Sequence, residues 1–423
     1  MSGWYRRIRD GIVAGGDTRD AAPPPAGSPG DARPDRGSAR IGAAVVLAFV
    51  VWLGISNPWT LVFVVGLVAS VFLHEVGHFV TARWAGMKVT QFYMGFGPRI
   101  WWRRRGEVEF GVRVLPVGAF VRIVGMNNLD ECDPADEPRA YRAQSYPKRM
   151  LVITAGSLMH LLIALVLFAG VYATAGRLED TGRVRLVAPP VADSPAEAIG
   201  LREGDVILAV GDTAVASQRE LVEAITAFAP GDRVVVSVLR DSQRLTVPAM
   251  LGASPVDASV AFLGVGTDSW DVRRLHPLGA VAAGAADAGR TAVQSVGGVL
   301  TVLNPLNIVR SVTNDDADPA TRPTTVVGAS RLGGELGRAI GLEGPLVLLA
   351  AVNVFVGVFN MLPLLPFDGG HAAIATYERL RTRRGRIYRA DVGKMVPVAT
   401  AVVALLVTLL MVGLYLDVAR PIG

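Results

Sequence analysis

Two histidines and a glutamate interrupt a long apolar stretch near the start of the chain. His74 and His78 are four residues apart, and Glu75 directly follows the first histidine. On a helix this spacing puts both imidazoles on one face, with the carboxylate beside them. The preceding residues, 59–73, carry no charge. Because ionisable groups are costly inside a membrane, we interpret the cluster as a functional site rather than as two core histidines and a helix-end glutamate.

The composition indicates a membrane protein with soluble parts. Of the 423 residues 51% are hydrophobic, and the mean hydropathy is +0.39, which is above the values usual for soluble proteins. The net charge of +5 comes from arginines that cluster beside apolar segments, so the positive-inside rule explains it better than direct binding to nucleic acid. Cys132 is the single cysteine, which excludes an intrachain disulfide and a cysteine-rich zinc site.

The apolar runs predict a polytopic α-helical protein of the cell membrane with about five transmembrane helices. The expected spans are residues 41–56, 59–83, 150–173, 345–366 and 396–417. The first is only about 16 residues long, against about 20 needed to cross a bilayer, so an interfacial helix is an alternative. Both arginine-rich loops, 83–149 and 379–389, then fall on one side, which the positive-inside rule makes cytoplasmic.

Residues 1–40 precede the first span and are rich in Pro, Gly, Ala, Asp and Arg. They have neither helical nor strand periodicity, and no apolar core follows their start as a signal peptide requires. We therefore expect a disordered cytoplasmic tail. A solvated extension and a regulatory or localisation role are both open for it.

Three segments between the spans have sequence patterns that differ from those of the spans. Within the first cytoplasmic loop, residues 95–121 alternate and break at Gly and Pro, which predicts a short membrane-associated β-sheet. Residues 276–342 predict amphipathic helices on the outer membrane face, with an acidic, disordered patch at 314–319. The charges of Asp287 and Arg290 argue against another crossing there, which would reverse the orientation of everything downstream.

Residues 183–267 predict an inserted α+β domain outside the cytoplasm, because strand-like alternation surrounds a helical piece at 220–227. The stretch Ser194–Ile207, followed by Val210–Asp212, resembles a PDZ domain. This resemblance implies binding of extended peptide ends by strand addition. A steric filter that binds no ligand is the alternative.

A third candidate metal ligand follows the span 345–366. Asp368 lies there between prolines and a pair of glycines. Zinc in catalytic sites usually has three protein ligands and keeps a fourth position for water. His74, His78 and Asp368 would supply the three, so the sequence predicts a zinc site in the cytoplasmic half of the spans.

Taken together, these motifs resemble the site-2 protease family of intramembrane zinc metalloproteases. The resemblance rests on the His74–His78 motif, on the PDZ-like module between spans, and on Asn360–Gly370. It covers about residues 58–417, and Gly328–Arg331 makes it closest to the actinobacterial branch. The family core would then have two halves, residues 57–176 and 343–423.

The resemblance implies a role for each matching residue. His74, His78 and Asp368 would bind Zn²⁺, and Glu75 would activate the water and deliver its proton to the leaving amine. Asn360 would bond the substrate backbone and hold a transmembrane helix locally extended; a helix–helix hydrogen bond is its alternative.

The family also implies regulated intramembrane proteolysis. A first protease trims a single-span membrane protein, such as an anti-sigma factor, and this enzyme then cuts inside the membrane. Signal-peptide remnants are a second substrate class. Membrane lipids surround the enzyme, and the PDZ-like module would exclude substrates with bulky outer domains.

The chain departs from the family in its second core span. Members commonly carry Ala-Gly-Pro and then Asn, whereas this chain has Ala155-Gly156-Ser157 and His160. No substrate-binding role is carried over to this helix, and we expect His160 to hydrogen-bond across helices or to site water. A non-enzymatic scaffold with a structural metal is the competing function. A fourth protein ligand, His160 or His371, would close the site and favour it.

Overall fold

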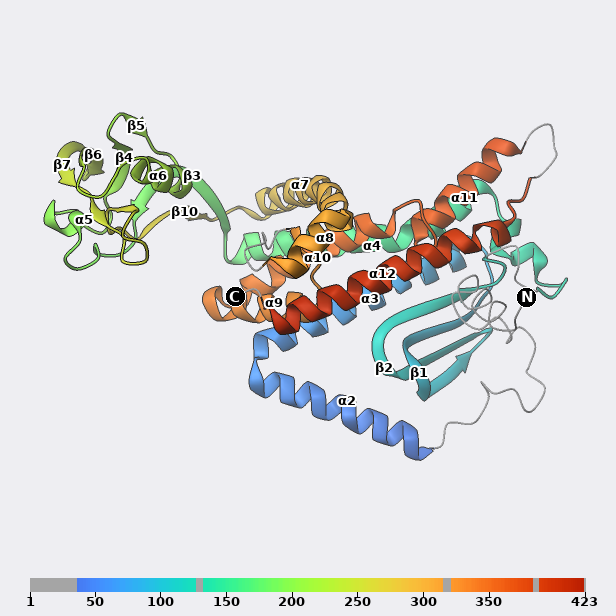
Figure 1. The fold of residues 1–423 in the computed structure, drawn as a ribbon. Coiled ribbons are helices and arrows are strands. Elements are labelled where there is room, and N and C mark those ends of the chain that lie inside the picture. The colour runs from blue at the N-terminus through green and yellow to red at the C-terminus, as the bar shows by residue number, and fades with distance from the viewer. Residues whose placement is uncertain (1–35, 127–131, 315–320, 383–387, 422–423) are drawn as a thin grey trace. The chain divides into compact units, whose positions relative to one another are not determined.

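The computed structural model describes residues 36–126, 132–314, 321–382 and 388–421 (Figure 1). It divides into two compact units, the first made of Met1–Val171 and Pro277–Gly423 and the second of Tyr172–His276. Of the tail expected at residues 1–40, residues 1–35 lie outside the described residues. Most of the acidic patch expected at 314–319 also lies outside them.

The first unit is built from helices and one small sheet. Its helices are α2 (Arg36–Ser56), α3 (Pro58–Trp84), α4 (Tyr146–Thr174), α7 (Pro277–Leu303), α8 (Pro305–Thr313), α9 (Val326–Ile340), α10 (Glu343–Asn360), α11 (Asp368–Arg381) and α12 (Val396–Ala419). Helix α4 continues to Thr174, at the boundary of the second unit.

Four helices are long and apolar enough to cross a membrane: α3, α4, α10 and residues 392–419. They correspond to four of the five predicted spans. The fifth, 41–56, forms the apolar part of α2 and is shorter than these helices. Helices α7 and α8, bent by 68° at their junction, would together be long enough for one further, broken span, where the sequence predicts outer-face helices without a crossing.

Helix α10 ends earlier than the predicted span 345–366. It stops at Asn360, and α11 begins at Asp368. The segment between them contains Pro363 and Pro366, and proline both lacks an N–H donor and disfavours helix in the residue before it. The apolar run therefore continues past the end of the helix.

Helix α3 begins with a capping signal that the sequence shows directly. Asn57 Oδ1 accepts hydrogen bonds from the backbone N–H groups of Trp59 and Thr60, at 3.1 and 3.3 Å, and Pro58 takes the first helical position, where no donor is needed. The start of α3 lies against α9, where a Cβ on Gly337 would come within 2.3 Å of the Trp59 ring. Small residues on α9 thus permit the close approach.

The small sheet of the first unit packs beside α3 (Figure 1). Strands β1 (Val89–Arg105) and β2 (Val108–Ile123) pair antiparallel, and Tyr93 is aligned with both Phe120 and Gly111, so the first part of β1 has neighbours on two sides. The Phe92 ring contacts those of Phe72 and Phe79 on α3, with centroids 5.5 and 5.2 Å away. These aromatic contacts hold the sheet against the helix that carries both histidines.

The second unit is an α+β domain with a sheet in the order β10-β3-β4-β6-β7 and β5 paired to β4. Its core includes Val184, Ile207, Leu221 and Val236. The predicted module, 183–267, lies within this unit. The strands and helices are β3 (Arg177–Leu186), α5 (Pro195–Ala198), β4 (Val206–Val210), β5 (Thr213–Ala214), α6 (Gln218–Thr226), β6 (Arg233–Arg240), β7 (Gln243–Met250), β8 (Gly252–Ala253), β9 (Ala261–Phe262) and β10 (Thr267–Arg273).

Candidate zinc centre

The two histidines of α3 turn the same ring atom toward one point. Their Nε2 atoms lie 3.1 Å apart, and both side chains are buried. His78 Nδ1 donates a hydrogen bond to the Val152 carbonyl of α4 at 2.7 Å. That bond places the proton on Nδ1 and leaves the Nε2 lone pair available for a metal.

Helix α4 approaches α3 closely beside His74 and His78 because it carries a glycine there. A Cβ on Gly156 would stand 2.3 Å from His74 Cε1 and 2.4 Å from His78 Nε2. Gly77 on α3 is equally constrained, because its Cβ would lie 2.9 Å from the Ala155 carbonyl oxygen. The two imidazoles therefore occupy the space that a side chain at residue 156 would fill.

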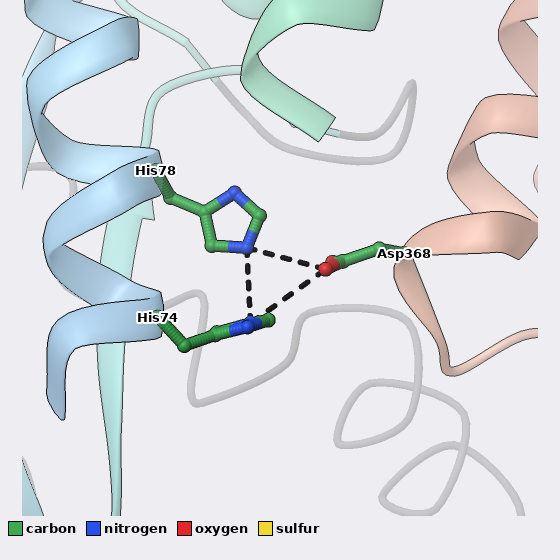
Figure 2. A group of neighbouring side chains, drawn as sticks. All are labelled: His74, His78 and Asp368. Atoms are coloured by element: carbon green, nitrogen blue, oxygen red, sulfur yellow. Dashed lines mark hydrogen bonds and ion pairs between the residues drawn. The ribbon is translucent and has the colours of Figure 1, made fainter. Parts of the chain in front are cut away.

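Asp368, the first residue of α11, completes the group (Figure 2). Its Oδ2 lies 3.2 Å from His78 Nε2 and 3.6 Å from His74 Nε2. Asn360, the last residue of α10, donates from Nδ2 to the same oxygen at 2.7 Å. Although about 290 residues separate Asp368 from the histidines, the structure brings all three predicted ligands together.

Close backbone contacts and a buried ion pair position α11, and with it Asp368. A Cβ on Gly369 would lie 2.2 Å from the Met361 carbonyl oxygen, and one on Gly370 would lie 2.6 Å from the Leu365 nitrogen, so the glycine pair lets α11 start against the preceding turn. Further along α11, Glu378 accepts a hydrogen bond from Arg149 of α4 at 2.7 Å, with both side chains buried. This ion pair ties α11 to the helix that faces the histidines.

The donor set fits zinc. Bonds of about 2.1 Å in tetrahedral geometry put ligand atoms about 3.4 Å apart, and the three separations here are 3.1, 3.2 and 3.6 Å. Two imidazole nitrogens and one carboxylate oxygen are a usual catalytic zinc set. Among the described residues, the group of possible ligands at this point contains these three and no fourth. Neither His160 nor His371 joins it, so the arrangement is that of an open site rather than a closed structural one.

Glu75 lies beside the three ligands. Its Oε1 is 3.9 Å from His74 Nε2, and its side chain is 17% exposed. The carboxylate lies next to the group of possible ligands without belonging to it, so it would be placed to take a proton from water that a metal here would hold.

A buried polar network, which the sequence indicates only in part through His160, lies next to His74. His160 Nδ1 donates to Asn353 Oδ1 of α10 at 2.8 Å, and Asn353 Nδ2 donates to Ser70 Oγ of α3 at 3.0 Å. All three side chains are at most 2% exposed. The His160 ring lies 4.9 Å from the His74 ring between centroids. The expectation that His160 bonds across helices fits this geometry, and a polar Asn353 within an apolar run indicates a buried hydrogen bond without identifying its partner.

Comparison with known proteins identifies the family. Residues 62–407 match the model of peptidase family M50. The chain belongs to peptidase family M50. It is 34% identical over 394 residues to the zinc metalloprotease Rip1 of Mycobacterium tuberculosis, covering 85% of this chain and 97% of the relative. The Rip1 protein of Mycolicibacterium smegmatis is 32% identical over 403 residues, again covering 85% of this chain and 97% of the relative.

The chain also has more distant relatives. A putative zinc metalloprotease of Mesorhizobium japonicum is 30% identical over 326 residues, covering 72% of this chain and 84% of the relative. These matches confirm the predicted site-2 protease family, the enzyme class and the zinc cofactor. The chain is a zinc metalloprotease, which decides against the non-enzymatic scaffold.

The chain also has PDZ-like structural neighbours. The PDZ domain of an SdrC-like protein from Listeria monocytogenes matches 21% of this chain and 88% of its own length, with 22% identity and a TM-score of 0.18. A solution structure from Geobacillus thermodenitrificans matches 21% of this chain and its own full length, with 25% identity and the same TM-score.

Proposed function

We propose that this zinc metalloprotease cleaves single-span membrane proteins inside the bilayer, in regulated intramembrane proteolysis. The observation that carries the proposal is the convergence of His74, His78 and Asp368, with Glu75 beside them, at α3, whose length and hydrophobicity are those of a membrane span. A metal site in such surroundings is reached by a peptide bond that is itself in the membrane.

The residues divide the chemistry between them. Zinc held by His74, His78 and Asp368 supplies Lewis-acid polarisation and a more acidic water. Glu75 takes a proton from the attacking water and delivers it to the nitrogen of the leaving amine. His78 keeps its Nδ1 proton on the Val152 carbonyl, so that Nε2 stays turned toward the site.

Asn360 serves both the metal and the substrate in this proposal. Its Nδ2 donates to Asp368, whereas its Oδ1 has no hydrogen bond among the residues that the structure describes. That oxygen is available to accept a backbone N–H of an unwound substrate. The predicted substrate contact is thereby compatible with the observed bond to Asp368.

The substrates we propose are anti-sigma factors already trimmed by a first protease, with signal-peptide remnants as a second class. In this arrangement the N-terminal tail is cytoplasmic, and the PDZ-like unit lies outside and excludes intact outer domains or binds the new peptide end. Support comes from the two arginine-rich loops on one side of the spans and from the relatives named Rip1.

A reconstituted cleavage assay tests the proposal. The purified protein is placed in vesicles with a single-span reporter, either trimmed or carrying its full outer domain, and products are mapped by mass spectrometry. We expect cuts within the apolar segment of the trimmed reporter, loss of cleavage with a zinc chelator, and recovery on adding zinc. Cuts confined to residues outside the apolar segment would contradict intramembrane cleavage. Equal cleavage of both reporters would contradict the exclusion of outer domains.

A further inference from the structure

A cavity lies within the first unit, apart from the zinc centre. It has a volume of about 700 Å³, and its walls come from α3, α7, α9, α10, α12 and the segment before α9. Among the residues that the structure describes, none of the proposed catalytic or zinc-binding side chains lines it.

Most of the cavity wall is aliphatic or aromatic and belongs to the apolar helices. Leu332 of α9 and Leu410 of α12 line it and are 40% and 55% exposed, so the cavity is open rather than sealed. In a membrane such an opening faces acyl chains, because water does not reach an apolar surface there.

One end of the cavity is polar and contains a buried carboxylate. Asp417 of α12 is 1% exposed, and its Oδ2 accepts hydrogen bonds from Thr325 Oγ1 at 2.6 Å and from the Thr325 and Gly328 nitrogens at 2.8 and 3.1 Å. Its Oδ1 accepts from Arg322 Nη2 at 3.2 Å. The carboxylate is thus neutralised and tied to the start of α9.

Two arginines at this end retain unused hydrogen-bond donors. Arg322 is nine-tenths buried and uses Nη1 and Nη2 on the Arg420 carbonyl and on Asp417, but its Nε is buried without a partner. Arg331 follows Gly328 by one helical turn, is exposed, and has no ion pair or hydrogen bond in the described part of the chain. Arg322 balances Asp417, so Arg331 leaves a net positive charge that favours an anionic ligand.

The volume of the cavity limits the size of the ligand that it can hold. A membrane-spanning helix about 10 Å wide and 30 Å long occupies roughly 2,400 Å³, several times the cavity. Pockets of about 300–1,000 Å³ hold small molecules or single chains. A substrate helix is therefore too large for this site.

We propose that the cavity binds an anionic phospholipid of the surrounding membrane. One acyl chain lies along the apolar wall, and the headgroup phosphate accepts hydrogen bonds from Arg331 and from Arg322 Nε. Because α9, α10 and α12 all line the cavity, the bound lipid fastens α12 to the other two helices.

Lipid titration of the full-length protein in detergent micelles tests the proposal. Phosphatidylglycerol and phosphatidylcholine are added in turn, and bound lipid and the melting temperature are measured by native mass spectrometry and thermal unfolding. R331Q removes the free cation, and its matched control R338Q removes an exposed arginine of the same helix that does not line the cavity. A329L fills the cavity, and A339L adds the same volume at an exposed position of α9.

We expect one phosphatidylglycerol to bind in preference to phosphatidylcholine and to raise the melting temperature. R331Q should weaken that binding about tenfold, the effect of losing one charged hydrogen bond, and A329L should abolish it, whereas both controls bind as the unaltered protein does. Equal binding of the two lipids, or equal loss in R331Q and R338Q, would overturn the proposal. So would displacement of the lipid by a single-span peptide. Because binding needs no proteolysis, the E75Q variant should give the same titration.

Discussion

Asn360 donates a hydrogen bond to Asp368 Oδ2 at 2.7 Å, and the same oxygen faces His78 Nε2. The last residue of α10 thereby orients the ligand that begins α11. The residue proposed to contact the substrate is, in this geometry, also a partner of the candidate metal site.

Replacing Asn360 should therefore weaken metal binding as well as catalysis. We expect N360A to lower zinc affinity about 10- to 100-fold, the usual effect of losing a ligand's hydrogen-bond partner. Competition with a chromogenic chelator measures this, with N307A in α8 as a control. Unchanged zinc affinity together with a higher KM would instead assign Asn360 to the substrate alone.

Gly156 should be indispensable to the zinc site. Because its Cβ would come within 2.4 Å of both imidazole rings, G156A should displace them and abolish stoichiometric zinc binding. G170A is the matched control on the same helix, since a Cβ at Gly170 meets nothing within 4 Å. Zinc content is measured on purified protein by elemental analysis. Full zinc occupancy in G156A would refute the tight fit between α4 and the histidines.

The network of His160, Asn353 and Ser70 should stabilise the first unit. N353A leaves the His160 Nδ1–H without its acceptor, and an unmet buried polar group costs about 1–3 kcal/mol. We expect a loss of about 2 kcal/mol in the free energy of unfolding for N353A and less for S70A, where the smaller Ser70 hydroxyl is lost. The cobalt-substituted enzyme adds a second readout, because a shift of His74 against the His160 ring changes its visible absorption. An unchanged spectrum and unchanged stability in N353A would remove any role for the network.

The second unit should lose stability in acid through one ion pair. Arg240 donates to both carboxylate oxygens of Asp205, at 2.8 and 2.6 Å, and this hydrogen bonding holds the pKa of Asp205 below its usual value. A carboxyl with a lowered folded-state pKa stabilises the fold above its unfolded pKa of about 3.9, and the stabilisation is lost as the pH falls below that value.

We expect R240A to destabilise the second unit by about 3 kcal/mol at pH 7, because it leaves a buried carboxylate without its cation. Much of the difference from the unaltered protein should disappear in acid, once the pH falls through the lowered pKa of Asp205 and the carboxyl is protonated in both proteins. Protease-resistance of the unit against pH measures the effect, with R244A on exposed Arg244 as the control. A difference that is constant over this pH range would contradict the assignment to Asp205.

The sequence indicates the residues of the candidate zinc site because their chemistry is local. The spacing of His74 and His78 fixes their common helix face, and the prolines and glycines around Asp368 mark a turn at the end of a span. The end of α10 at Asn360 was harder to predict, because hydrophobicity continues through the turn and does not distinguish a helix from an apolar loop.

Contacts between distant segments could not be predicted from the sequence. Nothing near His160 indicates that Asn353, 193 residues later, accepts its proton, and nothing near Asp417 indicates that it caps α9. The alignment of Tyr93 with both Phe120 and Gly111 likewise depends on how β1 and β2 bend. Such pairings are set by packing in three dimensions rather than by periodicity.

The most direct test of the proposed reaction compares E75Q with the unaltered enzyme on the trimmed single-span reporter, with the zinc content of both proteins measured in the same preparations. The ligands His74, His78 and Asp368 are intact in E75Q, so we expect equal zinc and a rate lowered by about 10²–10⁴ through loss of the general base. Equal zinc with an undiminished rate would contradict the role of Glu75 and with it the proposed reaction at this site.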